Sequence, residues 1–171
     1  FLIFCNSFAD IEFTRVVEEL KGVSFSLAFA NGCKTKDQYG SNKCHFQWGE
    51  KLEGNASAAL LQPLAAGSVV EVSFTIDRFI PFKQTCAVCG GECKIKIPIV
   101  DKQIDIPLPP CPIEPTKLSR SFAQALPVQE PIQAKVTLNG KFSLLNENKV
   151  PLLVVKVNAI IDPAKAVLEL Q

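Results

Sequence analysis

The cysteines offer the most reactive chemistry in this chain. Three of them fall within eight residues, at Cys86, Cys89 and Cys93, and Cys111 follows. Four thiolates are the ligand set of a structural zinc site, and the spacing from Cys86 to Cys89 is that of thiol–disulfide enzymes. Zinc sites usually present two well-separated pairs, and a redox pair normally opens a helix, whereas a strand is expected after this cluster. We therefore favour structural disulfides over a metal site.

The seven cysteines predict three disulfides and one remaining thiol. The pairing of Cys33 with Cys44 is expected, and Cys111 is expected to join either Cys93 or Cys89. Each bridge would stabilise the fold by roughly 2–4 kcal/mol. The thiol left over is Cys5, either buried or linked to another chain. The full disulfide set consists of Cys33, Cys44, Cys86, Cys89, Cys93 and Cys111.

No convincing catalytic group appears. The single histidine, His45, lies beside Cys44 in a segment expected to be a loop, and a Cys–His pair cannot act if Cys44 is in a disulfide. Asp101 and Asp105 have the chemistry of an acid–base pair, but strand polarity places them toward solvent. No glycine-rich phosphate loop occurs. The sequence therefore predicts that the protein is not an enzyme, and that it has no catalytic residue and no cofactor.

Composition narrows the class of protein. The 171 residues predict a single domain over 1–171, with residues 1–31 left without an assigned topology. A net charge of +1 gives no net field to attract nucleic acid or an anionic membrane. Many cysteines with one histidine, and no methionine even at position 1, predict a processed, secreted or lumenal protein. Asn55 begins an N-glycosylation sequon, which fits secretion.

The first third of the chain gives mixed signals. Residues 10–21 fit either a short helix or a strand. Residues 23–29 alternate apolar and small side chains, which predicts a strand that ends at Asn31 and Gly32. The polar, turn-rich residues 33–55 are expected to form a long surface loop tied down by cysteine.

The remaining chain alternates more clearly. Residues 70–76, 94–100 and 104–106 alternate apolar with polar side chains. Residues 132–138 do so up to a predicted turn at Asn139 and Gly140, and the alternation resumes at Phe142. A hairpin turn at residues 146–148 precedes a last strand around 153–157. Seven or so short alternating strands separated by turns predict an all-β, immunoglobulin-like β-sandwich of two antiparallel sheets.

Four short motifs, in order, carry a family resemblance. They are Val72-Ser73-Phe74-Thr75, Ile97-Pro98-Ile99, Cys111-Pro112-Ile113 and Leu126-Pro127-Val128. With them the chain resembles the ML lipid-recognition family, which includes the Niemann–Pick type C2 sterol carrier and the ganglioside activator. The resemblance covers roughly residues 65 to 161. One departure is that the final strand holds Leu153 and Val154 where the sterol carriers have a cysteine.

The resemblance implies two splayed sheets with an apolar cavity between them, and places Phe74, Ile113 and Phe122 in its lining. We hypothesise a secreted carrier that binds a sterol, fatty acyl lipid or carotenoid pigment noncovalently. The alternative is a ligand-free extracellular recognition module with a closed core. Transient docking on a membrane or an acceptor protein, and an oligomer through Cys5, also fit this hypothesis. Lys94 and Lys96 could guide an anionic membrane to the pocket mouth, but solvent-facing strand positions explain them better. The candidate ligand-binding residues are Val72, Phe74, Ile76, Ile97, Ile99, Ile113, Phe122, Leu126, Val136, Leu138, Phe142 and Val155.

Overall fold

The computed structural model describes residues 10–97, 102–126 and 134–163, and these residues form twelve β-strands and no helix. Accordingly, no helix that could span a membrane is found in the described part of the chain. The strands are β1 (Asp10–Leu20), β2 (Val23–Phe29), β3 (Cys33–Asp37), β4 (Gly40–Gln47), β5 (Lys51–Leu60), β6 (Val69–Ile76), β7 (Ile80–Ala87), β8 (Glu92–Ile97), β9 (Lys102–Pro107), β10 (Lys117–Ala125), β11 (Val136–Leu145) and β12 (Pro151–Ile161).

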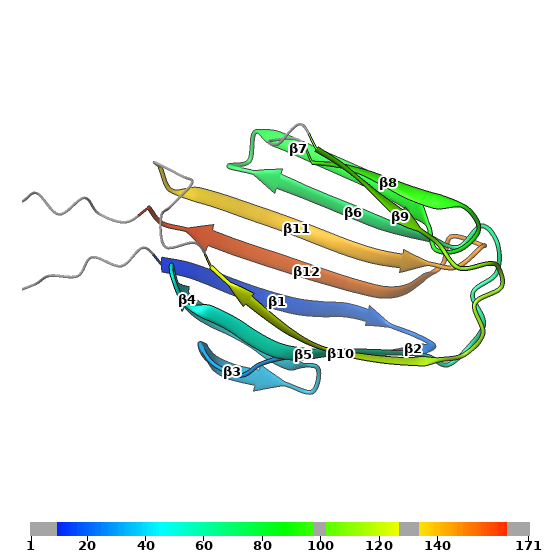
Figure 1. The fold of residues 1–171 in the computed structure, drawn as a ribbon, viewed down its shortest axis with the longest axis horizontal. Helices are drawn as coiled ribbons and strands as arrows, with labels where there is room; N and C mark the ends of the chain where they lie inside the picture. The colour runs from blue at the N-terminus through cyan, green and yellow to red at the C-terminus, as the bar shows by residue number, and fades with distance from the viewer. Residues whose placement is uncertain (1–9, 98–101, 127–133, 164–171) are drawn as a thin grey trace, which may run out of the picture.

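The strands form a β-sandwich, as the alternation predicted (Figure 1). The large layer runs in the order β4-β1-β12-β11-β6-β7, with β3 paired to β4, and the small layer is β2-β5-β10. A separate hairpin, β8–β9, makes its own two-stranded sheet. The two layers are hydrogen bonded to each other at one edge only among the described strands, through a parallel bridge between Leu27 of β2 and Gly40 of β4 and a hydrogen bond from Phe29 N to Ser41 Oγ at 3.0 Å. We call this edge the seam.

Residues 10–20 form a strand, which settles the choice left open by the sequence. β1 pairs antiparallel with β12 on one side and with β4 on the other, so it lies inside the large layer. Both neighbours are distant in the sequence. Their hydrogen bonds select the strand because they satisfy the backbone groups that a helix would otherwise satisfy internally.

The prediction of a long loop over residues 33–55 is wrong. This segment contains β3, β4 and the first half of β5, and β5 is paired on both sides, with β2 and β10. Its polar residues gave little strand signal because strand propensity depends on the neighbours that a strand acquires. Within it Ser41 is fully buried and Phe46 is 3% exposed, so β4 contributes to the interior.

The predicted turn at Asn139 and Gly140 is also wrong. β11 continues through both residues, where Asn139 pairs with Asn158 of β12 and with Thr75 of β6. The amide Nδ2 of Asn158 donates a hydrogen bond to Asn139 Oδ1 at 2.6 Å across the strands. Two flanking strands therefore hold extended a dipeptide that favours turns in isolation.

The hairpin turn after β11 forms where it was predicted. Asn146 Oδ1 accepts hydrogen bonds from the backbone N–H groups of Asn148 and Val150. Lys149 takes the left-handed conformation, with φ of 61°. The asparagine side chain thus fixes the reversal that brings β12 back along β11.

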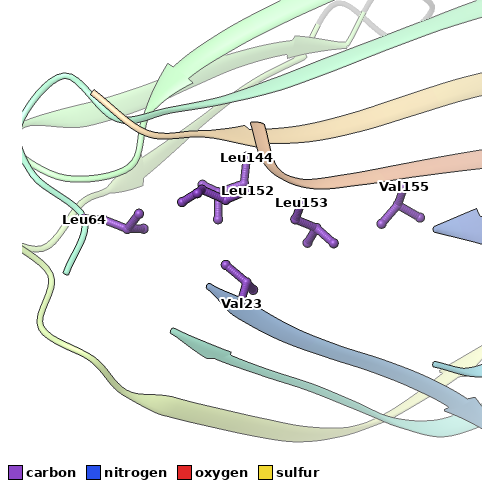
Figure 2. Packing of buried hydrophobic residues seen from close by; sticks show 6 residues of the cluster. All are labelled: Val23, Leu64, Leu144, Leu152, Leu153 and Val155. Carbon is purple, nitrogen blue, oxygen red and sulfur yellow. The ribbon is translucent and has the colours of Figure 1, made fainter. Parts of the chain in front are cut away.

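The packed core joins the two layers near the start of β2 (Figure 2). Val23 of β2 lies below Leu153 of β12 in this view, and Leu64 closes the cluster at the left, on the side of Leu152 and Leu144. Phe25 of β2 and Leu60 of β5 pack against this cluster from the small layer. This contact, rather than any hydrogen bond, holds most of the small layer on the large one.

Three disulfides tie the strands. They join Cys33 to Cys44, Cys86 to Cys93, and Cys89 to Cys111. Of the two partners left open for Cys111, the structure has Cys89. All four cysteines considered as zinc ligands are therefore in disulfides. Cys5 lies outside the described residues.

Arg15 holds the seam together and was not singled out from the sequence. It is 2% exposed, and its guanidinium donates to the carbonyl oxygens of Ser41 and Gly40 at 2.9 and 3.1 Å. It also pairs with Asp37 at 2.7 Å and lies 5.9 Å from the centroid of the Phe25 ring. One side chain on β1 thus contacts β2, β3 and β4, at the point where the layers meet.

The carboxylate of Asp37 responds to this arrangement. Burial raises its pKa, but the hydrogen bond and positive charge of Arg15 and the N–H of Tyr39 outweigh that effect. The pKa of Asp37 is therefore held below its ordinary value of 3.8.

Candidate ligand-binding site

Seven of the predicted ligand-binding residues share one face of three adjacent strands. Within β6, β11 and β12, Phe142 lies opposite both Val72 and Val155, and Leu138 lies opposite Ile76. Strand alternation keeps such residues on the same side of the sheet. These seven residues, which form the inner face of the large layer, are Val72, Phe74, Ile76, Val136, Leu138, Phe142 and Val155.

At the β6–β7 side this face opens into a pocket of about 480 Å³. Only two of the predicted residues, Val72 and Phe74, lie in its wall. The rest of the wall comes from Val70 of β6, from β7, from the loop that follows β7, and from the β8–β9 hairpin with the residue after it. The complete lining is Val70, Val72, Phe74, Phe82, Gln84, Cys86, Ala87, Val88, Cys93, Lys96, Ile106 and Leu108.

The β8–β9 hairpin forms the roof of this pocket. It is held to β7 by the disulfide between Cys86 and Cys93, and by a hydrogen bond from Gln84 Nε2 to the carbonyl oxygen of Lys94 at 3.0 Å. The floor is built on β6 and β7, where the rings of Phe74 and Phe82 stack with their centroids 4.4 Å apart. The roof therefore rests on one covalent and one polar contact, and apolar side chains face the space between.

Gly140 lies in the row of residues beside this floor. It is paired with Phe74 on one side and Val157 on the other, and it brings no side chain to the inner face. A Cβ at this position would meet Phe74 Cβ at 3.8 Å and the Val157 carbonyl oxygen at 3.7 Å, which are ordinary contacts. The site is thus unobstructed rather than crowded at this glycine.

Electrostatics in the pocket are simple. Of the wall residues that the structure describes, Lys96 is the one ionisable residue and Gln84 the one uncharged polar side chain. The amide of Gln84 already donates to the Lys94 carbonyl, while the ammonium of Lys94 pairs with Glu92 at 2.9 Å. The wall therefore offers apolar contact along most of its area and one cation at its β8 side.

The remaining predicted residues lie elsewhere or outside the description. Ile113 packs against the core and forms an isolated bridge with Leu64. Phe122 on β10 meets the Phe29 ring edge-on at 5.5 Å, in the small layer. Leu126, just beyond β10, donates its backbone N–H to Glu50 O. The side chain of Ile97 and all of Ile99 lie outside the described residues.

The groups first considered for catalysis are not assembled into a site. His45 lies on β4 rather than in a loop, with Nε2 3.3 Å from Asp10 Oδ1, and its neighbour Cys44 is in a disulfide. Asp105 is exposed and accepts a hydrogen bond from Gln103, while Asp101 lies outside the described residues. Across residues 10–97, 102–126 and 134–163 no group of three or more His, Cys, Asp or Glu side chains is arranged to hold a metal ion.

A second hollow, of about 670 Å³, lies on the outer face of the large layer. Its wall includes Lys83, Lys141 and Lys156 together with the paired Asn139 and Asn158. Two of these lysines are neutralised by Glu71 at 3.7 Å and Glu18 at 2.6 Å. The wall of this hollow carries three lysines and two asparagines, whereas the wall of the inner pocket has one lysine and one glutamine, so the smaller inner pocket is the better candidate for an apolar guest.

The sequence hypothesis missed most of the pocket wall. Phe82, Gln84 and Cys86 alternate along β7 in the printed sequence, and this alternation was a signal that they share a face. Val88 and Leu108 lie in irregular segments, where no periodicity identifies an inward side chain. Leu108 belongs to the proline-rich segment 107–115, which contributes to the wall and is anchored by the disulfide of Cys111.

Comparisons with known proteins add a fold-level likeness. No family model matches the chain, and no curated protein matches its sequence. Among solved structures, chicken MD-1 complexed with lipid IVa is similar over 90% of each chain, with 13% identity and a TM-score of 0.41. A likeness of this degree says nothing of what the present chain binds.

Proposed function

We propose that this chain is a carrier that binds a hydrophobic small molecule noncovalently between the large layer, at β6 and β7, and the β8–β9 sheet. The observation that carries the proposal is the inner pocket of about 480 Å³, whose wall is apolar apart from Gln84 and Lys96. Its volume lies within the range of roughly 300–1,000 Å³ typical of small-molecule sites. Apolar walls of this kind bind by removing the guest from water, at about 25 cal/mol per Å² buried.

The guest we propose is a lipid with one extended or flat apolar body, such as a fatty acyl chain, a sterol or a carotenoid. The wall has few groups that could impose orientation by hydrogen bonding, so selection rests on shape and apolar area. No bond is made or broken, and the chain acts as a carrier rather than an enzyme. The ML-like motifs of the sequence support the same class of ligand.

We also propose that the carrier works in an oxidising, extracellular or lumenal compartment. Three disulfides are dense for 171 residues, and such bridges persist where thiols are not kept reduced. The exposed Asn55 of the sequon lies on β5, where Ser121 Oγ donates to its Oδ1. A glycan there would cover the small layer and leave the β6–β7 side free.

Ligand extraction and a matched pair of variants test the proposal. Native mass spectrometry of the protein from its natural source, followed by organic extraction, would identify a bound guest. For recombinant protein, titration with a fluorescent fatty acid and a fluorescent sterol measures uptake. Val72→Phe places a ring in the pocket wall, whereas Ser73→Phe places the same ring on the outer face of the same strand.

We expect Val72→Phe to weaken uptake by at least tenfold and Ser73→Phe to leave it within twofold of the wild type. Thermal unfolding of both variants shows whether each still folds. An equal loss of probe uptake in both variants would mean that the guest does not bind in this pocket. A clean apo mass with no uptake of either probe would favour the closed recognition module instead.

A further inference from the structure

The turn between β6 and β7 carries the most exposed large apolar side chain among the described residues. Phe79 is 85% exposed, and the adjacent Ile80 is 51% exposed. Scattered single apolar residues are normal on protein surfaces, but two adjacent ones at the tip of a hairpin are an exposed apolar point. We call Phe79 and Ile80, together with the turn residues Asp77 and Arg78, the hairpin tip.

Hydrogen bonds within the turn and to β11 hold the hairpin tip. Asp77 and Arg78 both have positive φ, of 49° and 63°, and Phe79 N donates to Ile76 O at 3.1 Å, which defines a tight two-residue turn. Asp77 is fastened to β11, since its N–H donates to Thr137 O and its Oδ1 accepts from Thr137 N at 2.7 Å. Two non-glycine residues in this conformation cost free energy. The turn therefore presents Phe79 outward rather than letting it fold back.

Unpaired positive charge accompanies the apolar point. Arg78 has no ion pair among the described residues, and neither does the exposed Lys96. β8 returns along β7 from the Cys86–Cys93 disulfide past Lys94, so Lys96 lies toward the tip end of the hairpin roof. The carboxylate of Asp77 is engaged by the Thr137 amide. The tip thus combines an aromatic ring with the cation of Arg78 and the carboxylate of Asp77, and Lys96 of the roof adds a second cation at the end of the inner pocket that holds Phe74 and Phe82.

We propose that the hairpin tip docks this protein onto anionic lipid bilayers. Two side chains are too small an area for a specific protein interface, which buries about 800 Å² on each partner. A bilayer interface, in contrast, accepts a single aromatic side chain, and cations beside it are attracted by anionic headgroups. Docking in this orientation would bring the Phe82 end of the pocket to the membrane surface. The inference stands on the tip alone and does not require that the pocket be filled.

Vesicle binding tests the docking proposal on the whole chain. The probes are phosphatidylcholine vesicles with and without phosphatidylserine, and co-sedimentation or light scattering measures the partition coefficient. Phe79→Ser removes the aromatic ring. Leu118→Ser is the matched control, because Leu118 is 65% exposed but lies on β10 in the small layer.

We expect Phe79→Ser to weaken binding to phosphatidylserine vesicles by about tenfold or more, because an aromatic side chain is no longer buried. Arg78→Gln should weaken it about fivefold, and added salt should reduce it further. Leu118→Ser should stay within twofold of the wild type. All three variants should keep the wild-type melting temperature, since each side chain is exposed.

Several outcomes would overturn the proposal: no binding to phosphatidylserine vesicles, equal binding to pure phosphatidylcholine, or equal loss in Phe79→Ser and Leu118→Ser. Concentration-dependent self-association that Phe79→Ser abolishes, without vesicle binding, would assign the tip to a second copy of the chain instead. These outcomes are independent of ligand uptake. A carrier that binds its guest but not vesicles would therefore refute only the docking inference.

Discussion

The two edges of the sandwich differ in how the layers meet. At the seam, Leu27 of β2 is bridged to Gly40 of β4, with the Leu27 N–H donating to Tyr39 O, and Arg15 fixes the junction. At the far edge, β7 and β10 are the two ends of the hydrogen-bonded strand order. There the β8–β9 hairpin stands over β6 and β7 and leaves about 480 Å³ beneath it. The same sheet is closed on one side and hollow on the other.

A single row of side chains illustrates the difference. Val155, Phe142 and Val72 lie opposite one another on β12, β11 and β6. Val155 is 5% exposed within the core, whereas Val72 is half-buried in the pocket wall. Both valines obey the same alternation. The alternation chooses the face of the sheet, and the element packed against that face decides whether the residue becomes core or pocket wall.

Removing Arg15 should have the largest effect, at the seam. Arg15→Met keeps much of the side-chain length but leaves the Ser41 and Gly40 carbonyl oxygens without their donor. We expect a loss of about 3 kcal/mol in the free energy of unfolding, measured by urea denaturation.

Arg120→Met is the control for this change, because Arg120 is exposed on β10. It should alter stability by no more than about 0.5 kcal/mol. A loss below about 1 kcal/mol for Arg15→Met would mean that the backbone bridge alone holds the seam.

The matched valines should show an intermediate effect. Val155→Ala leaves a hole in the packed core and should cost about 2 kcal/mol, since two methyl groups and their contacts are lost. Val72→Ala enlarges a space that is already open and should cost less than about 1 kcal/mol. Ligand titration beside the denaturation curves should show a change in affinity for Val72→Ala alone. Equal stability losses would mean that the pocket closes over Val72 in solution.

Acidification should produce the smallest effect, again at the seam. Because the folded-state pKa of Asp37 lies below its ordinary value of 3.8, its ionised form stabilises the fold above that pH. The stabilisation is lost as the pH falls below 3.8 through the folded-state pKa. Asp37→Asn should therefore show a shallower decline in stability over this acid range than the wild type. If the stability of the two proteins declined in parallel, Asp37 would not contribute to the loss of stability in acid.

The sequence predicted the structure best where apolar and polar side chains alternate along one strand. The strands at residues 23–29 and 70–76 and the turn at residues 146–148 follow from local alternation and from the side chain of Asn146. It failed at residues 33–55 and at Gly140, where polar or turn-forming residues are held extended by strands on both sides. Local propensity cannot include hydrogen bonds from strands that are distant in the chain.

The candidate site was only partly predictable for the same reason. Val72 and Phe74 in the pocket wall were identified by alternation; outside the site, at the seam, Arg15 interrupts the otherwise apolar face of β1. By itself the sequence determined an all-β, disulfide-bonded sandwich with an aliphatic interior, because strand period and cysteine content are local properties. Only the tertiary structure decided where that interior is filled, because a pocket depends on the distance between the β8–β9 hairpin and the sheet it covers. That distance is set by Cys86, Cys93 and Gln84, which are contacts between strands rather than properties of any one strand.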